Sequence, residues 1–127
     1  MLSPEPDERN ERERAEDRRP LPNVPLGLVL KTCLEMQTYH EGPIRHWHQL
    51  VATADRVRPM MGISPSAWDA AREAMGPEEA AIVVCAMLER FSEIRSPGGY
   101  LRSLTAKAED GAFSSGLMVM ALMRKAA

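Results

Sequence analysis

The stretch Ser64–Glu89, SPSAWDAAREAMGPEEAAIVVCAMLE, decides the fold class of this 127-residue chain. Its first half carries the signals of a helix start, with a serine as N-cap and Pro65 as the first helical residue. Ile63 and Trp68 fall at the two positions of a hydrophobic staple, which fixes the direction of the chain as it enters a helix. These signals predict a helix over 64–75 that ends at Gly76.

The second half of the stretch is apolar on every face. Its apolar residues run from Ala80 to Leu88, a length that also suits a buried strand. Glu78 and Glu79 ahead of the run suit the N-terminus of a helix, where the helix dipole favours negative charge. The pattern therefore favours a central helix over 77–91. The two helices imitate a helix-turn-helix motif, but a core helix that begins with two carboxylates is not suited to reading DNA.

Similar start and stop signals recur on both sides of this stretch. They predict further helices over 26–40, from Pro43 to about Met60, over 97–110 and after Ser114-Ser115. No segment shows the sustained alternation of a half-buried strand. We therefore predict an all-α fold, a compact bundle of five to six short helices in a single domain, residues 26–127.

Charge is distributed unevenly along the chain. Residues 1–25 hold seven acidic and five basic side chains with five prolines, which predicts a disordered, charged and proline-rich tail or linker. The remaining residues hold eleven acidic and eleven basic side chains, so the predicted domain is neutral. Nucleic-acid binding draws on clustered positive charge, and the bulk charge gives no support for it.

No known catalytic, metal or cofactor motif is present. His46 and His48 lie two residues apart, which on a helix separates their side chains by about 200°, and His40 lies beyond a Gly-Pro break. Glu78-Glu79 and Glu109-Asp110 are adjacent pairs whose members diverge on a helix. We therefore expect no enzyme activity, no cofactor and no metal.

The cysteines and the hydropathy pattern indicate the compartment. Cys33 and Cys85 lie in separate apolar patterns, as expected of two reduced core cysteines. No apolar run reaches the length of a membrane span, and the N-terminus lacks the apolar core of a signal peptide. We expect a soluble, cytoplasmic protein without membrane contact.

The segment SPGGYLR, 96–102, offers one candidate site. Gly98 and Gly99 at a helix start, with Arg95 and Arg102 nearby, have the composition of an anion site. The same glycines also permit close packing of a neighbouring helix, and the modest positive charge favours this interpretation. A DNA contact would use Arg95, Arg102 and Lys107, together with Arg124 and Lys125.

Met118, Met120 and Met123 in the last predicted helix offer a second candidate site. They either fill the core or line an adaptable surface that binds a partner. Methionine side chains are more often buried in proteins, which favours the core. Met118 and Met120 point to different sides of a helix, so one side can require another molecule to cover it. Self-association is one version of this hypothesis.

Three segments carry a resemblance to a known family. They resemble the C-terminal domain of RepC, the replication initiator of repABC plasmids in alphaproteobacteria. The segments are PLGLVLKTC, IRHWHQLVATADRVRPMMGISPSAWDAAREAMGPEEAA and EIRSPGGYLRSLTAKAEDGAFSSGLMVMALM. The resemblance covers nearly all of 25–124 and is most specific over 62–104. Leu117 stands where the family pattern has a proline, which puts the start of the last helix in doubt.

The resemblance implies a role in starting plasmid replication at an origin within the initiator's own coding region. It also implies that specific DNA binding belongs to a larger N-terminal winged-helix region, to which 1–25 would be the linker. The chain is then an excised domain, a truncated reading frame or an independent product. Expected partners are that N-terminal region, host replication proteins or a second copy. The alternatives are a direct DNA-binding module that uses the basic residues named above and an inactive remnant.

Overall fold

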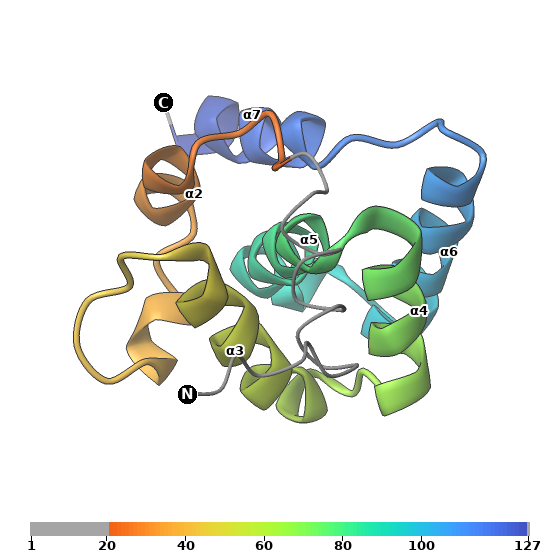
Figure 1. Ribbon diagram of the computed structural model, residues 1–127, viewed down its shortest axis with the longest axis horizontal. Helices are drawn as coiled ribbons and strands as arrows, with labels where there is room; N and C mark the ends of the chain where they lie inside the picture. Colours follow the sequence, from red (N-terminus) through yellow and green to blue (C-terminus); the bar gives the residue numbers. More distant parts are fainter. Residues whose placement is uncertain (1–20, 127) are drawn as a thin grey trace, which may run out of the picture.

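Helix α5, Pro77–Glu89, lies at the centre of the computed structural model, which describes residues 21–126 (Figure 1). Every side chain from Ala80 to Met87 is buried, and α3, α4, α6 and α7 all pack against this helix. The described residues form six α-helices and no strand, which confirms the all-α prediction and the central position of this segment. The other α-helices are α2 (Leu26–Thr32), α3 (Trp47–Val57), α4 (Pro65–Met75), α6 (Pro97–Glu109) and α7 (Ser115–Ala126).

Helix α4 begins as its sequence predicts. The Ser64 Oγ accepts a hydrogen bond from the Ala67 amide at 3.1 Å, and Pro65 is the first helical residue. Ile63 and Trp68 are both buried, as the hydrophobic staple requires. The helix ends at Gly76, whose φ of +90° lies in a region that side chains disfavour. This glycine lets α5 follow α4 without an intervening loop.

The predicted helix over 26–40 is wrong in its second half. Helix α2 ends at Thr32, and a separate 3-10 helix covers Met36–Tyr39. The Gln37 Nε2 donates to the carbonyl oxygens of Leu30 at 2.7 Å and Cys33 at 3.1 Å, so its side chain satisfies groups at the helix end. This break buries Met36 completely, and packing therefore overrides the local helical pattern.

The helix predicted from Pro43 starts later, at Trp47. The Gln49 Oε1 accepts hydrogen bonds from the amides of Arg45 at 2.7 Å and His46 at 3.0 Å, so the residues before α3 are tied to its first turn. His46 itself is extended, with φ −134° and ψ 151°. A 3-10 helix, Arg58–Met61, follows α3, and Gly62 at φ +81° ends it.

The remaining boundaries lie close to their predicted positions. Helix α5 ends at Glu89 rather than at residue 91, and a short 3-10 helix covers Phe91–Glu93. Helix α6 follows the Ser96 cap and ends before Gly111, whose φ is +71°. Helix α7 begins directly after Ser114, whose Oγ accepts from the Gly116 amide at 3.3 Å. The leucine at 117 therefore does not displace the start of the last helix.

Two helix pairs flank the central helix. Helix α4 packs against α6, and the short α2 packs against α7, so the two ends of the domain lie side by side (Figure 1). Val24 is already buried ahead of α2, so contact with the core starts before residue 26. The rest of the predicted tail, residues 1–20, lies outside the described residues.

Candidate functional site

The two glycines at the start of α6 make different contacts. The Gly99 amide donates to the Ser96 Oγ at 3.3 Å, so this serine caps the helix. A Cβ added at Gly98 would lie 3.3 Å from the carbonyl oxygen of Gly62, in the loop ahead of α4. The bare backbone of Gly98 therefore permits a close approach of α6 to that loop, which supports the packing interpretation of SPGGYLR. An anion contact here stays a prediction.

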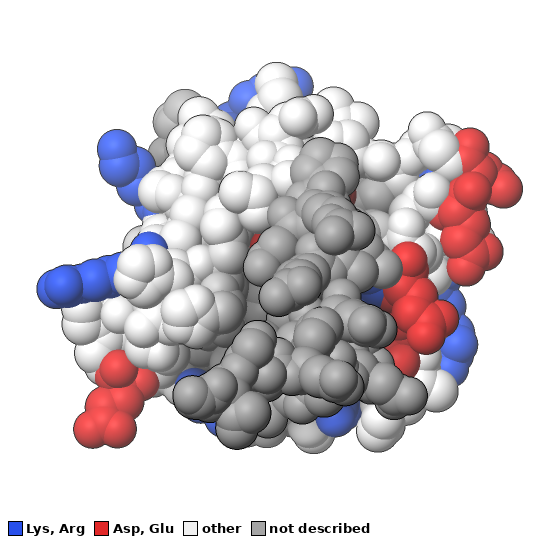
Figure 2. All heavy atoms as spheres, in the orientation of Figure 1, with Lys and Arg blue, Asp and Glu red and all other residues white. Residues whose placement is uncertain are grey.

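The basic residues predicted to accompany these glycines are spread along α6. The Arg102 Nη2 donates to the Ser66 Oγ at 2.8 Å and so links α6 to α4. Arg95 precedes the helix, where it borders a hollow of about 170 Å³ together with Met118. Lys107 lies in the last turn, about 140° around the helix from Arg102. On the face drawn in Figure 2, Lys and Arg lie at separate points around the rim, and Asp and Glu lie at the lower left and on the right.

The methionines of α7 divide between the interior and the surface. Met118 is half-buried against the core, whereas 53% of Met120 and 42% of Met123 is exposed. Leu117, which the sequence analysis names only as a departure from the family pattern, is 67% exposed. Leu117, Met120 and Met123 recur at intervals of three residues, so they share one side of the helix. We call Leu117, Met120 and Met123 the α7 surface.

A groove of about 320 Å³ borders the α7 surface. One wall is formed by Leu117, Val119 and Met120 of α7, and the facing wall by the segment from Asn23 to Pro25 with Leu28 of α2. Val24 approaches α7 so closely that a Cβ added at Gly116 would lie 3.4 Å from its Cγ2. An exposed apolar helix face beside an apolar groove is typical of a protein-interaction site.

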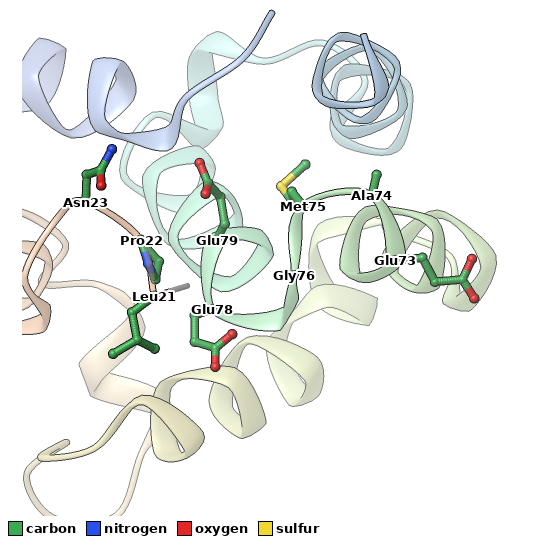
Figure 3. Close-up of a pocket in the computed structure, with 9 residues that line it drawn as sticks. All are labelled: Leu21, Pro22, Asn23, Glu73, Ala74, Met75, Gly76, Glu78 and Glu79. Atoms are coloured by element: carbon green, nitrogen blue, oxygen red, sulfur yellow. The ribbon is translucent and has the colours of Figure 1, made fainter. Parts of the chain in front are cut away.

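An acidic hollow of about 470 Å³ lies at the other side of Asn23, which lines both cavities. Its acidic side chains are Glu73 of α4 and Glu78 and Glu79 of α5. Figure 3 shows that these carboxylates point in different directions, with Glu79 directed towards the start of α7. The Glu79 Oε1 accepts from the Ser115 amide at 2.8 Å. The arrangement stabilises a helix start and does not bring two carboxylates onto one reacting atom.

The histidines lie closer together than predicted. The rings of His46 and His48 stack with centroids 5.5 Å apart and planes 6° from parallel. The 200° separation is wrong because His46 precedes the helix and is extended. Across residues 21–126, no three His, Cys, Asp or Glu side chains group as ligands for a metal ion.

Neither cysteine has the environment of a nucleophile. Cys33 and Cys85 are free and buried, as expected of core cysteines. Burial raises the pKa of the Cys33 thiol from 9.0 to about 11, and burial also raises the pKa of Cys85, with a further contribution from Cys33. Both thiols are therefore protonated at neutral pH, whereas nucleophilic cysteines require a thiolate.

In the helix pair that imitates a helix-turn-helix motif, α4 and α5, the second helix lies in the interior of the domain. Helix α5 is buried from Ala80 to Met87, so it has no exposed side to insert into a DNA groove. Between residues 21 and 126, none of the helices combines the length and the apolar character needed to cross a membrane.

Comparison with known proteins identifies the family. The family described as the replication protein C C-terminal region matches residues 25–125. The chain belongs to this family. The chain is 48% identical over 106 residues to a protein from Rhizobium rhizogenes that is named as a replication protein C. A protein of the same name from Sinorhizobium fredii is 45% identical over 108 residues.

These matches cover 83% and 84% of the chain but only 26% and 27% of the two relatives. The chain therefore spans about a quarter of the length of those proteins. No solved structure matches it.

Proposed function

We propose that this domain acts in plasmid replication and maintenance as a protein-interaction module of a replication initiator, without catalysis and without DNA contact of its own. Membership of the replication protein C family and the names of the two relatives support the role in replication. The partners proposed are the DNA-binding region of the initiator, host replication proteins or a second copy of the domain.

The observation that carries the proposal is the α7 surface. Three large apolar side chains, Leu117, Met120 and Met123, are exposed on one side of a helix that packs its Val119 and Leu122 into the core. Burying such side chains stabilises a complex by roughly 25 cal/mol per Å² of apolar surface, so they favour a partner that covers them. The described basic side chains offer less to a polyanion, since Arg102 contacts Ser66 and Lys107 lies on another side of α6.

A replication assay tests this proposal in the full-length initiator that contains this domain. Met120→Glu is expected to lower plasmid copy number without changing the affinity of the initiator for origin DNA. Met60→Glu is the matched control, because Met60 is also an exposed methionine, at 63%, and lies in the 3-10 helix after α3. Equal copy numbers for both variants and the unchanged initiator would contradict the proposal and favour an inactive remnant.

Direct DNA binding by the isolated domain is the competing outcome. An electrophoretic shift of origin DNA at about 50 mM salt that disappears steeply by about 200 mM salt would favour it. We expect no shift with the unchanged chain. If a shift is seen, Arg95→Gln and Arg102→Gln measure the contribution of the basic residues at the α6 start.

A further inference from the structure

A hollow of about 290 Å³ lies between α3 and α4, beside the start of α5. Trp68 and Arg72 of α4 form one wall, and Pro77 and Glu78 of α5 complete the lining. The facing wall is a single side of α3, because its lining residues recur at intervals of three and four. These residues are His48, Val51, Ala52 and Asp55. The lining therefore combines apolar and charged groups, and none of the sites described above includes it.

Trp68 leaves a polar group without a partner in this hollow. Its side chain is buried, and its Nε1 has no hydrogen-bond partner among residues 21–126. Buried donors in native proteins are almost always paired, so an unpaired one requires an explanation. The guanidinium of Arg72, 5.9 Å from the centre of the Trp68 ring, only donates and cannot be the acceptor. The hollow therefore suits an occupant that brings an acceptor, such as a peptide carbonyl oxygen.

The described part of the chain begins next to this hollow. Leu21 lines the neighbouring acidic hollow, and Glu78 lines both hollows. Figure 3 shows that the side chains of Leu21 and Glu78 extend on the side opposite to that of Glu79. Three extended residues span about 10 Å, and Pro20 favours an extended conformation of the residue before it. The residues directly before Leu21 are therefore long enough to enter the hollow.

The charges of these residues match those of the hollow in order. Residues 16–19 read EDRR, so their two arginines lie nearer to the described chain and would meet Glu78. The two acidic residues follow and would lie towards Arg72. Asp55, the other acidic residue of the lining, already bonds to Arg58 at 3.1 Å. An extended backbone also presents free carbonyl oxygens, which can accept from the Trp68 Nε1.

The apolar groove beside the α7 surface fits the same segment less well. Asn23 lines both that groove and the acidic hollow, so the segment can reach either side. Met1 and Leu2 are the only large apolar residues of 1–20. Charged side chains lose solvation against an apolar wall without gaining a partner. Composition therefore directs the segment to the hollow between α3 and α4.

We propose that residues 16–20 dock in the hollow between α3 and α4, where a backbone carbonyl oxygen accepts from the Trp68 Nε1 and the arginines pair with Glu78. This inference goes beyond the proposed function, because it concerns a contact within the chain and not the partner of the α7 surface. Docking fixes the direction in which the chain leaves the domain. Exposed ion pairs are screened by salt, so docking is expected to weaken as the salt concentration rises.

Proton–nitrogen NMR of the two tryptophan indoles in the full chain tests the hydrogen bond. Trp47→Phe leaves one indole signal and so assigns it to Trp68. Arg18→Glu/Arg19→Glu reverses the charges that face Glu78. It is expected to move the Trp68 indole proton signal upfield, because the donor loses its acceptor, and to leave the Trp47 signal in place.

The matched control makes the same change of charge further along the same segment. Arg12→Glu/Arg14→Glu is expected to leave both indole signals in place. Glu78→Gln is expected to move the Trp68 signal in the same direction as Arg18→Glu/Arg19→Glu, and combining the two changes should move it little further. Circular dichroism checks that each variant keeps its helices.

A nitroxide label tests the location of the segment. Ala15→Cys places the label next to residues 16–20 without changing their charge, and the two native cysteines are buried. The label is expected to broaden the amide signals of Val51 and Ala52 more than those of Leu117 and Met120. Adding Arg18→Glu/Arg19→Glu should abolish this difference, whereas the control variant should keep it.

Two results would overturn the inference. One is a Trp68 indole signal that does not respond to Arg18→Glu/Arg19→Glu, which would show that the segment supplies no acceptor. The other is broadening at Val51 that is no stronger than at Leu117, because the segment is then either undocked or bound in the groove beside the α7 surface.

Discussion

The carboxylate of Glu79 accepts a hydrogen bond from the backbone amide of Ser115, at 2.8 Å and across 36 residues of sequence. Glu79 lies in the first turn of α5, and Ser115 is the first residue of α7. One side chain therefore sits at the N-terminal ends of two helices, where negative charge is favoured at both. This contact holds the start of α7 against the central helix and so fixes the position of the α7 surface.

Replacing Glu79 is expected to destabilise the domain more than replacing its neighbour. Glu79→Ala removes the acceptor for a buried amide and should cost about 1–2 kcal/mol of unfolding free energy. Glu78→Ala is the matched control, because it removes a carboxylate from the same first turn without a bond to Ser115. Urea unfolding followed by circular dichroism measures both. Equal losses for the two variants would show that the Ser115 bond contributes nothing.

Alanine substitution at two helical glycines is expected to give opposite signs. Gly27→Ala in α2 meets nothing within 4 Å and should stabilise the domain by about 0.5–1 kcal/mol. Gly98→Ala in α6 would place its Cβ 3.3 Å from the backbone oxygen of Gly62, and we expect it to destabilise. Thermal unfolding of both variants measures the difference. A stabilising Gly98→Ala would contradict the role of this glycine in close packing.

The contact of Arg102 with Ser66 is expected to contribute little on an exposed surface. Arg102→Gln and Ser66→Ala should each cost less than about 1 kcal/mol, and the double variant should cost less than their sum, because both remove the same bond. A double-mutant cycle by urea unfolding measures the coupling. Strict additivity would show that the 2.8 Å contact has no energetic effect.

The buried thiols are expected to make stability fall at alkaline pH. The pKa of Cys33 is raised from 9.0 to about 11 in the folded protein, chiefly by burial, and that of Cys85 is also raised. As pH rises, the thiols of the unfolded chain lose their protons first. The contribution of the buried thiols to the free energy of unfolding is therefore fully present below about pH 9 and is lost as pH rises towards 11. For Cys33 alone the loss is at most about 2.7 kcal/mol.

Unfolding free energies at pH 7, 9 and 10.5 check this expectation. The Cys33→Ala/Cys85→Ala variant is the control, since other side chains also titrate in this range. Its stability should start lower, because two buried side chains are truncated, and fall less between pH 9 and 10.5. Parallel curves for the two proteins would contradict the assigned thiol pKa values.

The sequence predicts best those elements whose local signals agree with the packing. The Ser64 cap and the staple of Ile63 and Trp68 place the start of α4 well, and Gly76 places its end, because each acts through its immediate neighbours. The long apolar run of α5 indicates a central helix for the same reason.

The errors occur where distant contacts decide the local structure. Gln37 ends α2 through its bonds to Leu30 and Cys33, and Glu89 of α5 accepts from the Glu35 amide at 2.8 Å, which ties the break to the core. The stacking of His46 on His48 depends on an extended residue before α3. The sequence also does not predict which of the α7 methionines are buried, because helical spacing does not tell which side of a helix is covered.

The central position of α5 also determines how the domain loses its structure. Helices α3, α4, α6 and α7 all pack against α5, so removal of any one of the four exposes buried side chains of α5 that also contact the other helices. No part of the fold then has a hydrophobic interior of its own. Melting should occur as one all-or-none event with coincident optical and calorimetric transitions, and a fragment cut within the Gly42 or Gly62 turn should be degraded rather than persist.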